Sequence, residues 1–125
     1  MLATTETESF SVTQLFAGNS DVRTTDVTVV AGQNLAAGTV VGRITASGKI
    51  MKSVIGAVDG SAVPIGIMVN AVDATAADKA GSIYVGGDFN VDALVWDAGY
   101  NTDLLKLKAF DGTDITVRNL TFSVG

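Results

Sequence analysis

The sequence contains no cysteine and no histidine among its 125 residues. Without thiols there is no disulfide, no thiolate zinc site and no cysteine nucleophile, and the redox compartment is left undetermined. Without imidazole, the usual proton-transfer group near neutral pH and the Ser-His-Asp arrangement are both excluded. These two absences remove most of the familiar catalytic and metal-binding chemistries.

Long apolar runs are also missing. The run 63–72 is interrupted by Pro64, Gly66 and Asn70, and it is much shorter than the ~20 residues that a membrane-spanning helix needs. Residues 1–9 carry no basic segment and no apolar core, so they do not resemble a secretory signal. We therefore expect no membrane partner and a protein that is made and used on the cytoplasmic side, unless lysis releases it.

Basic residues are few. Eight Lys and Arg stand against thirteen Asp and Glu, which gives a net charge of −5. A nucleic-acid binder normally needs a basic face to neutralise phosphates, so we expect no nucleic-acid partner. Most of the aspartates lie beside Gly, Thr or Asn, where Asp typically bonds its own local backbone in turns. We therefore expect no catalytic pair, no metal, no cofactor and no small-molecule substrate: the protein is predicted not to be an enzyme.

Small apolar residues dominate what is present. The hydrophobic fraction is 47% but the aromatic fraction only 6%, and 14 Gly accompany a single Pro. This composition is typical of short strands and tight turns. It predicts a mainly β fold with one or two short helices, a compact β-rich structure of the barrel or tulip-like kind. The mean hydropathy of +0.39 also indicates that apolar surface is covered, and self-association is one ordinary way to cover it.

Alternating apolar residues predict the strands. The alternating pattern begins at Asp26 and recurs in the segments 39–44, 49–52, 65–69, 82–85 and 115–117. Pro64 restricts the strand that follows it to a sheet edge or to a strand start. We expect Gly86 and Gly87 to end the strand 82–85, and the segment 73–79 to be a loop or a short helical turn.

Two segments have a helical character. The segment 89–96 fits either a strand or a short helix, whereas Asn101, Thr102 and Asp103 are typical of a helix N-terminus. Near the end of the chain the apolar alternation changes phase between residues 115–117 and 120–124. This change predicts a bulge, or two consecutive strands that face different layers.

The chain is predicted to divide into an N-terminal arm, residues 1–25, and a single β-rich domain, residues 26–125. The arm starts with a Thr/Glu-rich stretch and then offers four large apolar side chains: Phe10, Val12, Leu15 and Phe16. It is either a frayed terminus or an arm that is disordered alone and orders on a partner, and the two interpretations are compatible.

One stretch resembles a different class of protein. Residues 31–44 resemble the strand–turn–strand opening of biotinyl and lipoyl carrier domains, and Met51-Lys52 faintly resembles their modified Met-Lys pair. Ile50 and Ser53 depart from that pattern, and the lysine comes too early in the chain. Lys52 is therefore interpreted as a surface lysine, and a carrier module stays as the alternative function.

The order of motifs along the chain resembles the lambda-type phage head decoration proteins from about residue 18 to residue 118. The resemblance is carried by Gly18-Asn19-Ser20-Asp21 after a polar arm, by the hairpin 32–44, and by the segments 59–68, 84–89, 94–96 and 109–115. The tail 119–125 departs from the pattern and looks like an added strand.

This resemblance implies a homotrimer seated on the outer surface of the virion capsid, at the three-fold positions of the expanded head. The trimers would clamp the major capsid protein against the pressure of packaged DNA. The arm residues Phe10, Val12, Leu15 and Phe16 would then be the capsid anchors. Phe89, Trp96 and Tyr100 form a possible aromatic patch, either core or subunit interface, and are the candidates for the trimer contact. Another small β assembly module, such as a tail or baseplate component, is also open, as is the oligomeric state of the free protein.

Overall fold

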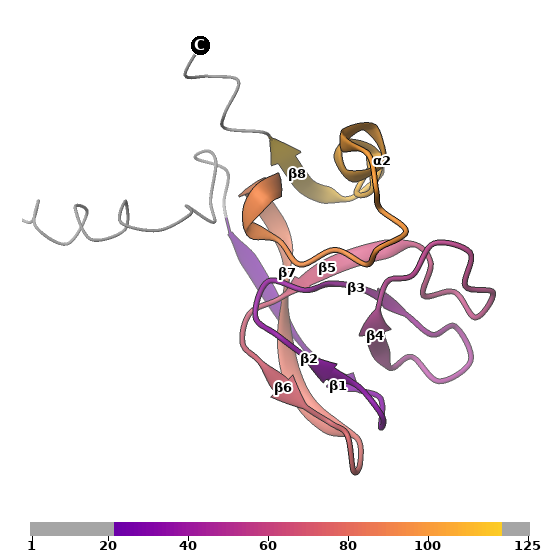
Figure 1. Ribbon diagram of the computed structural model, residues 1–125. Helices are drawn as coiled ribbons and strands as arrows, with labels where there is room; N and C mark the ends of the chain where they lie inside the picture. The colour runs from indigo at the N-terminus through magenta and orange to yellow at the C-terminus, as the bar shows by residue number, and fades with distance from the viewer. Residues whose placement is uncertain (1–21, 119–125) are drawn as a thin grey trace, which may run out of the picture.

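The computed structural model describes residues 22–118, and the remaining residues at both ends of the chain are outside this description. Strands and turns make up most of the described chain (Figure 1), and the elements in chain order are β1 (Arg23–Val29), β2 (Asn34–Leu35), β3 (Val40–Arg43), β4 (Ile50–Lys52), β5 (Pro64–Met68), β6 (Val72–Asp73), β7 (Lys79–Asn90), the 3-10 helix η1 (Val91–Ala93), α2 (Asp103–Lys108) and β8 (Asp114–Arg118).

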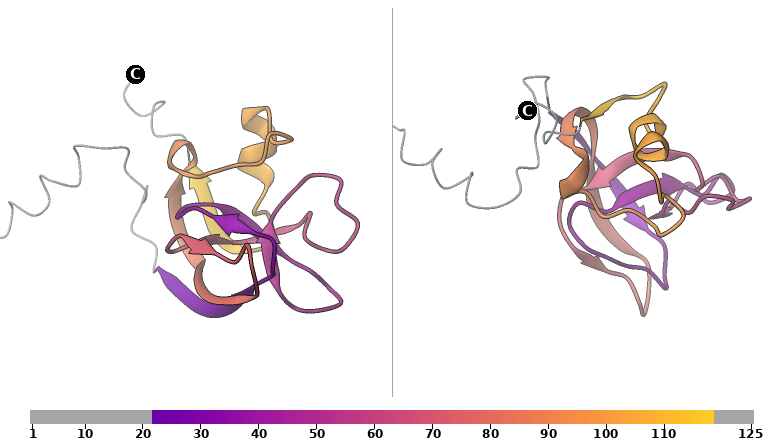
Figure 2. Two further views of the ribbon diagram at one scale, coloured as in Figure 1. Left: turned by 60° about the horizontal axis from the view of Figure 1, so that its bottom comes forward. Right: turned by 45° about the horizontal axis from the view of Figure 1, so that its top comes forward.

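Five of the strands close into a small barrel. They follow the order β1-β4-β3-β5-β7, and β1 pairs with β7 to complete the circuit. Strand β8 is added to β7 in parallel, and β2 and β6 form a separate two-stranded sheet. Figure 2 shows η1, α2 and β8 gathered at one end of the barrel. The mainly β, barrel-like fold with little helix that the sequence predicts is therefore confirmed.

The fold has two cores, one on each face of the central strands. Val41 and Met68 lie in one apolar cluster with Ile50 and Ile83, whereas Val40 and Ile67 lie in another with Phe89. Consecutive residues of β3 and β5 are thus buried on opposite faces, as expected for strands that are covered on both sides. The second cluster is completed by residues from η1, β8 and the segment between them: Val91, Leu94, Phe110, Ile115 and Val117.

The prediction that Gly86 and Gly87 end a strand is wrong. Strand β7 runs through both glycines to Asn90. Gly87 has a φ of +135°, a backbone conformation that side chains disfavour, and the pairing between β1 and β7 shifts register next to Arg23. The glycines therefore bend β7 and let it continue into a second pairing with β8, because a bulge redirects a strand without ending it.

Several local predictions are confirmed. Pro64 is the first residue of β5, where it needs no ladder hydrogen bond from its nitrogen. Thr102 is the N-cap of α2, and its hydroxyl oxygen accepts a hydrogen bond from the Leu105 N–H at 3.2 Å. The predicted loop 73–79 is confirmed only for residues 74–78, because Asp73 ends β6 and Lys79 begins β7. The ambiguous segment 89–96 contains the end of β7 followed by η1. The predicted phase change after residue 117 falls mostly outside the described residues.

Candidate functional site

The predicted arm anchors Phe10, Val12, Leu15 and Phe16 lie outside the described residues, so their surroundings are not described. What the structure gives is the place from which the arm departs. Strand β1 begins at Arg23, earlier than the alternation beginning at Asp26 indicates. Figure 1 shows the start of β1 and the end of β8 at the same end of the molecule.

An ion pair fastens these two strands across β7. Arg23 in β1 and Asp114 in β8 both lie opposite Gly86 of β7, and the Arg23 guanidinium contacts the Asp114 carboxylate. A Cβ added to Gly86 would lie 2.7 Å from the Arg23 Nε, so the missing side chain leaves the space in which the guanidinium crosses β7. Both charged side chains are more than half exposed, so the pair positions the strands more than it stabilises them.

A second ion pair lies further along β7. Arg118, at the end of β8, is 3.4 Å from the carboxylate of Asp88, whose side chain is 7% exposed. Since β1 is antiparallel to β7 and β8 is parallel to it, Arg23 at the start of β1 and Arg118 at the end of β8 both lie toward the end of the sheet at which β7 ends. We call Arg23, Asp88, Asp114 and Arg118 the terminal face.

The three aromatic candidates for a trimer contact belong to the interior of one chain. Phe89 is fully buried, Tyr100 is 6% exposed and Trp96 is partly buried. The Trp96 ring lies 5.1 Å from the Tyr100 ring and 6.3 Å from the Phe110 ring. Both Phe89 and Tyr100 are thus part of the buried interior of the single chain. Their place in a trimer stays a prediction, and any such role would be as support for the surface above them.

The aromatic cluster does connect two surface segments. The Tyr100 hydroxyl lies 3.1 Å from Ser53 Oγ, and Ser53 Oγ donates to the Ala62 carbonyl at 3.1 Å. These bonds tie Tyr100 to both ends of the loop between β4 and β5, residues 53–63. Phe110, on the other side of Trp96, directly follows α2 and its C-cap Ala109.

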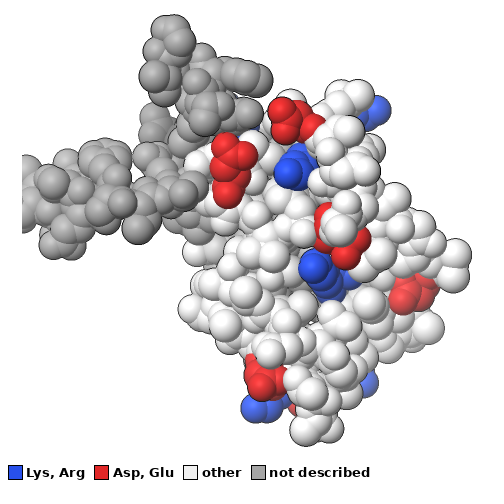
Figure 3. Space-filling model, viewed as in Figure 1, with Lys and Arg blue, Asp and Glu red and all other residues white. Residues whose placement is uncertain are grey.

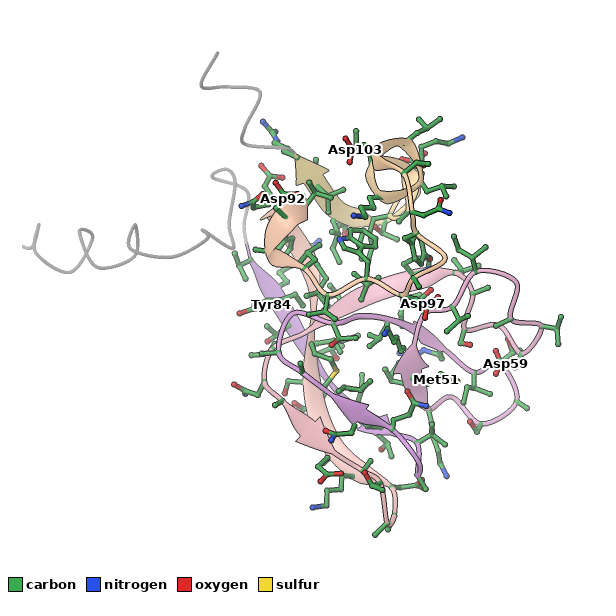
Figure 4. The ribbon with its side chains drawn as sticks, in the orientation of Figure 1. Met51, Asp59, Tyr84, Asp92, Asp97 and Asp103 are labelled. Carbon is green, nitrogen blue, oxygen red and sulfur yellow. The ribbon has the colours of Figure 1, made fainter. Side chains whose placement is uncertain are left out.

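Both of these segments expose apolar side chains, which sequence reasoning missed. In the loop, Ile55 is 43% exposed, Val63 64% and Val58 100%. In α2, no residue is buried, and its three leucines are all exposed: Leu104, Leu105 and Leu107. Figure 4 shows the loop around the Asp59 label at the right of the view and α2 beside the Asp103 label at the top. A signal was present in the sequence, because leucine occupies three of the six positions of this helix.

Several aspartates of the described residues accept hydrogen bonds in turns and loops. Hydrogen bonds from the Ser61 hydroxyl and backbone N–H lower the pKa of Asp59, and those from Thr75 lower the pKa of Asp73. The pKa of Asp78 is lowered by its hydrogen bond with Lys49 and by the N–H of Ala31. Each carboxylate is thus a local acceptor in a turn or between loops. Residues 22–118 contain no group of three or more carboxylates that could hold a metal ion.

Lys52, the lysine of the alternative carrier interpretation, is the last residue of β4, where it pairs with Val41 of β3. Its backbone N–H donates to the side chain of Gln33 at 3.2 Å. Its ammonium group is 4.0 Å from the Asp97 carboxylate.

Figure 3 shows that uncharged residues make up most of this side of the molecule, with small scattered groups of charge.

The described residues form a small β-barrel that exposes apolar side chains on the loop 53–63 and on α2. The family model of the bacteriophage lambda head decoration protein D matches residues 3–116. The chain therefore belongs to this family and is a structural protein of the phage capsid. A search of curated proteins finds no match to the chain.

The limits of the family match are informative. It begins at residue 3, so the segment with Phe10, Val12, Leu15 and Phe16 lies within the family model. It ends at residue 116, so the tail 119–125, which looks added in the sequence, lies beyond it. Within residues 22–118, no helix has the length and apolar character needed to cross a membrane.

Proposed function

We propose that this protein binds the outer surface of the expanded phage head as a trimer at the three-fold sites, and that it stabilises the head against the pressure of packaged DNA. The observation that carries this proposal is the family match over residues 3–116. The protein acts by binding and not by catalysis, and its partners are other copies of itself and the major capsid protein.

The terminal face is the side that meets the capsid. The arm leaves the barrel at Arg23, where the ion pair with Asp114 holds β1 against the end of the sheet. An arm that starts from a fixed point on the body is delivered to one place on the capsid surface. Alternating anchors in an extended arm are suited to strand addition, in which backbone hydrogen bonds supply affinity and side-chain pockets supply specificity. Phe10, Val12, Leu15 and Phe16 supply those anchors.

Three arms in one trimer multiply a weak contact. Once the first arm is bound, the others are held near their own sites at high effective concentration, so the trimer binds far more tightly than one arm alone. A trimer attached to several capsid subunits also links those subunits. Such links resist the outward movement of the subunits, which is the mechanical basis of stabilisation.

Co-sedimentation with expanded heads that lack their own decoration protein tests the proposal. The full chain is expected to bind saturably, and a chain that starts at residue 18 is expected to lose binding while keeping its circular dichroism spectrum. Serine at Phe10, Val12, Leu15 and Phe16 should have the same effect. A matched variant with alanine at the neighbouring polar residues Ser9, Ser11 and Thr13 should bind normally. Normal occupancy by the truncated chain would contradict the role of the arm.

A further inference from the structure

We propose that neighbouring copies in the trimer contact one another head to tail, with the loop 53–63 of one copy packed on α2 of the next. This inference rests on the proposed trimer and assigns the surfaces that build it. It involves only residues that the structure describes, and it is independent of the arm.

The loop is a fixed support for an apolar tip. Its base is held by Ser53 and Ser61, which are 1% and 0% exposed, and Asp59 accepts from both the Ser61 hydroxyl and the Ser61 N–H. The Asp59 carbonyl in turn accepts from the Thr45 N–H at 2.8 Å. Val58, one residue from this anchored aspartate, is nevertheless fully exposed. A loop held in place by its own hydrogen bonds cannot fold such a side chain back onto the body.

Helix α2 differs from the loop, because it lacks the burial that a short helix needs. A six-residue helix is too short to be stable through its own backbone bonds, and such helices normally depend on burial of an apolar face. None of the residues of α2 is buried in one copy, and Leu104 is 65% exposed. Its anchors to the body are instead the flanking residues Tyr100 and Phe110, whose rings pack on Trp96. An apolar partner would supply the missing burial.

A second copy of the chain is the partner that fits both the exposed tip of the loop and the unburied helix. Exposed apolar surface on a soluble protein commonly marks an interaction site, and the loop and the helix can cover each other only if they come from different molecules placed head to tail. The charges also match: the helix carries Lys106 and Lys108 in its last turn, and the loop carries the ionised Asp59. A heterologous contact of this kind closes into a ring when the rotation between copies allows it.

Both surfaces are braced from the same aromatic cluster, which fixes their relative positions. Tyr100 bonds to the loop through Ser53 and packs on Trp96, and Trp96 packs on Phe110 at the end of the helix segment. A rigid connection between two different contact surfaces is what a closed ring requires, because each copy must present both at a constant angle.

Cross-linking through engineered cysteines tests the contact, since the natural chain has no cysteine. Val58→Cys and Val63→Cys place a thiol on the loop, and Leu104→Cys and Leu107→Cys place one on the helix. Each loop variant is mixed with each helix variant and treated with a short flexible bismaleimide, both free in solution and on saturated heads. Val22→Cys, whose side chain is 46% exposed in the wild type, replaces the helix partner in the control mixtures.

The head-to-tail contact predicts covalent dimers in at least one loop–helix mixture and none in the Val22→Cys mixtures or with any single variant alone. Dimers formed by one variant alone would show that like surfaces meet, and would overturn the proposal. Absence of dimers in all four mixtures, on heads that carry normal occupancy, would overturn it too. Failure of the wild-type chain to bind heads is a separate result, which rejects the capsid function but leaves a positive cross-link in solution valid.

Discussion

At the scale of single residues, most polar side chains of the described region hold loops in place. Tyr100 is the clearest example, because its ring is buried beside Trp96 while its hydroxyl reaches Ser53 Oγ. The second acceptor within reach of that hydroxyl is the Ala62 carbonyl, at 3.5 Å. One side chain thereby joins the aromatic cluster to the loop 53–63. In residues 22–118, no buried side-chain polar atom is left without a hydrogen-bond partner.

Replacing Tyr100 with Phe should lower the free energy of unfolding by about 1–2 kcal/mol, because the buried Ser53 hydroxyl loses a partner while the ring packing is kept. Urea denaturation followed by tryptophan fluorescence measures the change. Lys79→Ala serves as the control and is expected to stay within about 0.5 kcal/mol of wild type, since this side chain is exposed at the start of β7 and lies outside both proposed contact surfaces. An unchanged stability in Tyr100→Phe would show that the hydroxyl does not anchor the loop.

The carboxylate of Asp59 should make stability depend on acid pH. Hydrogen bonds from Ser61 lower the pKa of this carboxyl below its ordinary value of 3.8 in the folded protein. Its contribution to stability is therefore complete above that value and is lost as the pH falls through the lower folded pKa. Asp59→Asn keeps an acceptor oxygen but cannot titrate, so its free energy of unfolding should fall less steeply between about pH 5 and about pH 2. Equal slopes for the two proteins would contradict this role.

At the scale of elements, β7 organises the molecule. It pairs with β1 and β5 along its first part and with β8 along its last part. The bend at Gly87 separates these two parts, and its neighbour Gly86 leaves the space for Arg23. The barrel and the terminal face are thus built on one continuous strand.

Gly87→Ala should lower the free energy of unfolding by roughly 1–3 kcal/mol, because an alanine is strained at this positive φ. Gly81→Ala is the matched control in the same strand. Gly81 has an ordinary φ, and its nearest Cβ neighbour would be the movable end of the Val72 side chain at 3.1 Å, so a smaller loss is expected. Thermal unfolding of the two variants measures the difference, and equal losses would mean that the bend is not a point of strain.

The sequence predicts the strands better than it predicts what joins them. Alternation identifies β3 and β5 because their apolar residues are regular, and Thr102 identifies the start of α2 because a cap acts locally. The continuation of β7 through Gly86 and Gly87 could not be predicted, since it depends on pairing with β8, which lies more than twenty residues further along the chain. Phe89 and Tyr100 could not be assigned to core or interface, because the same apolar character suits both places.

At the scale of the whole molecule, we propose separate tasks for the arm and the body. The loop and helix surfaces proposed for contact between copies belong to the body, and the proposed capsid anchors belong to the arm. The two are joined at the terminal face, where Arg23 begins β1. Removal of the arm should therefore leave contacts between copies intact.

Light scattering behind a sizing column can check this separation. The full chain and a chain starting at residue 18 should show the same oligomeric state across a matched concentration series, with a trimer of the full chain at three times 12.8 kDa. The control is the Leu104→Ser/Leu107→Ser double variant of the full chain. Its mass should shift toward that of the monomer across the same concentration series. Dissociation caused by loss of the arm alone would show that the arm builds the trimer.

The central claim is mechanical, and DNA retention tests it most directly. Filled heads without decoration protein are saturated with the full chain, and their occupancy is verified by sedimentation. During heating, the fluorescence of a DNA-binding dye reports released DNA, and loss of that signal on nuclease treatment shows that the DNA lies outside the heads. Decorated heads should retain their DNA to a higher temperature than bare heads, and heads treated with the chain starting at residue 18 should behave as bare heads. Release at the same temperature from bare and fully occupied heads would contradict the stabilising function.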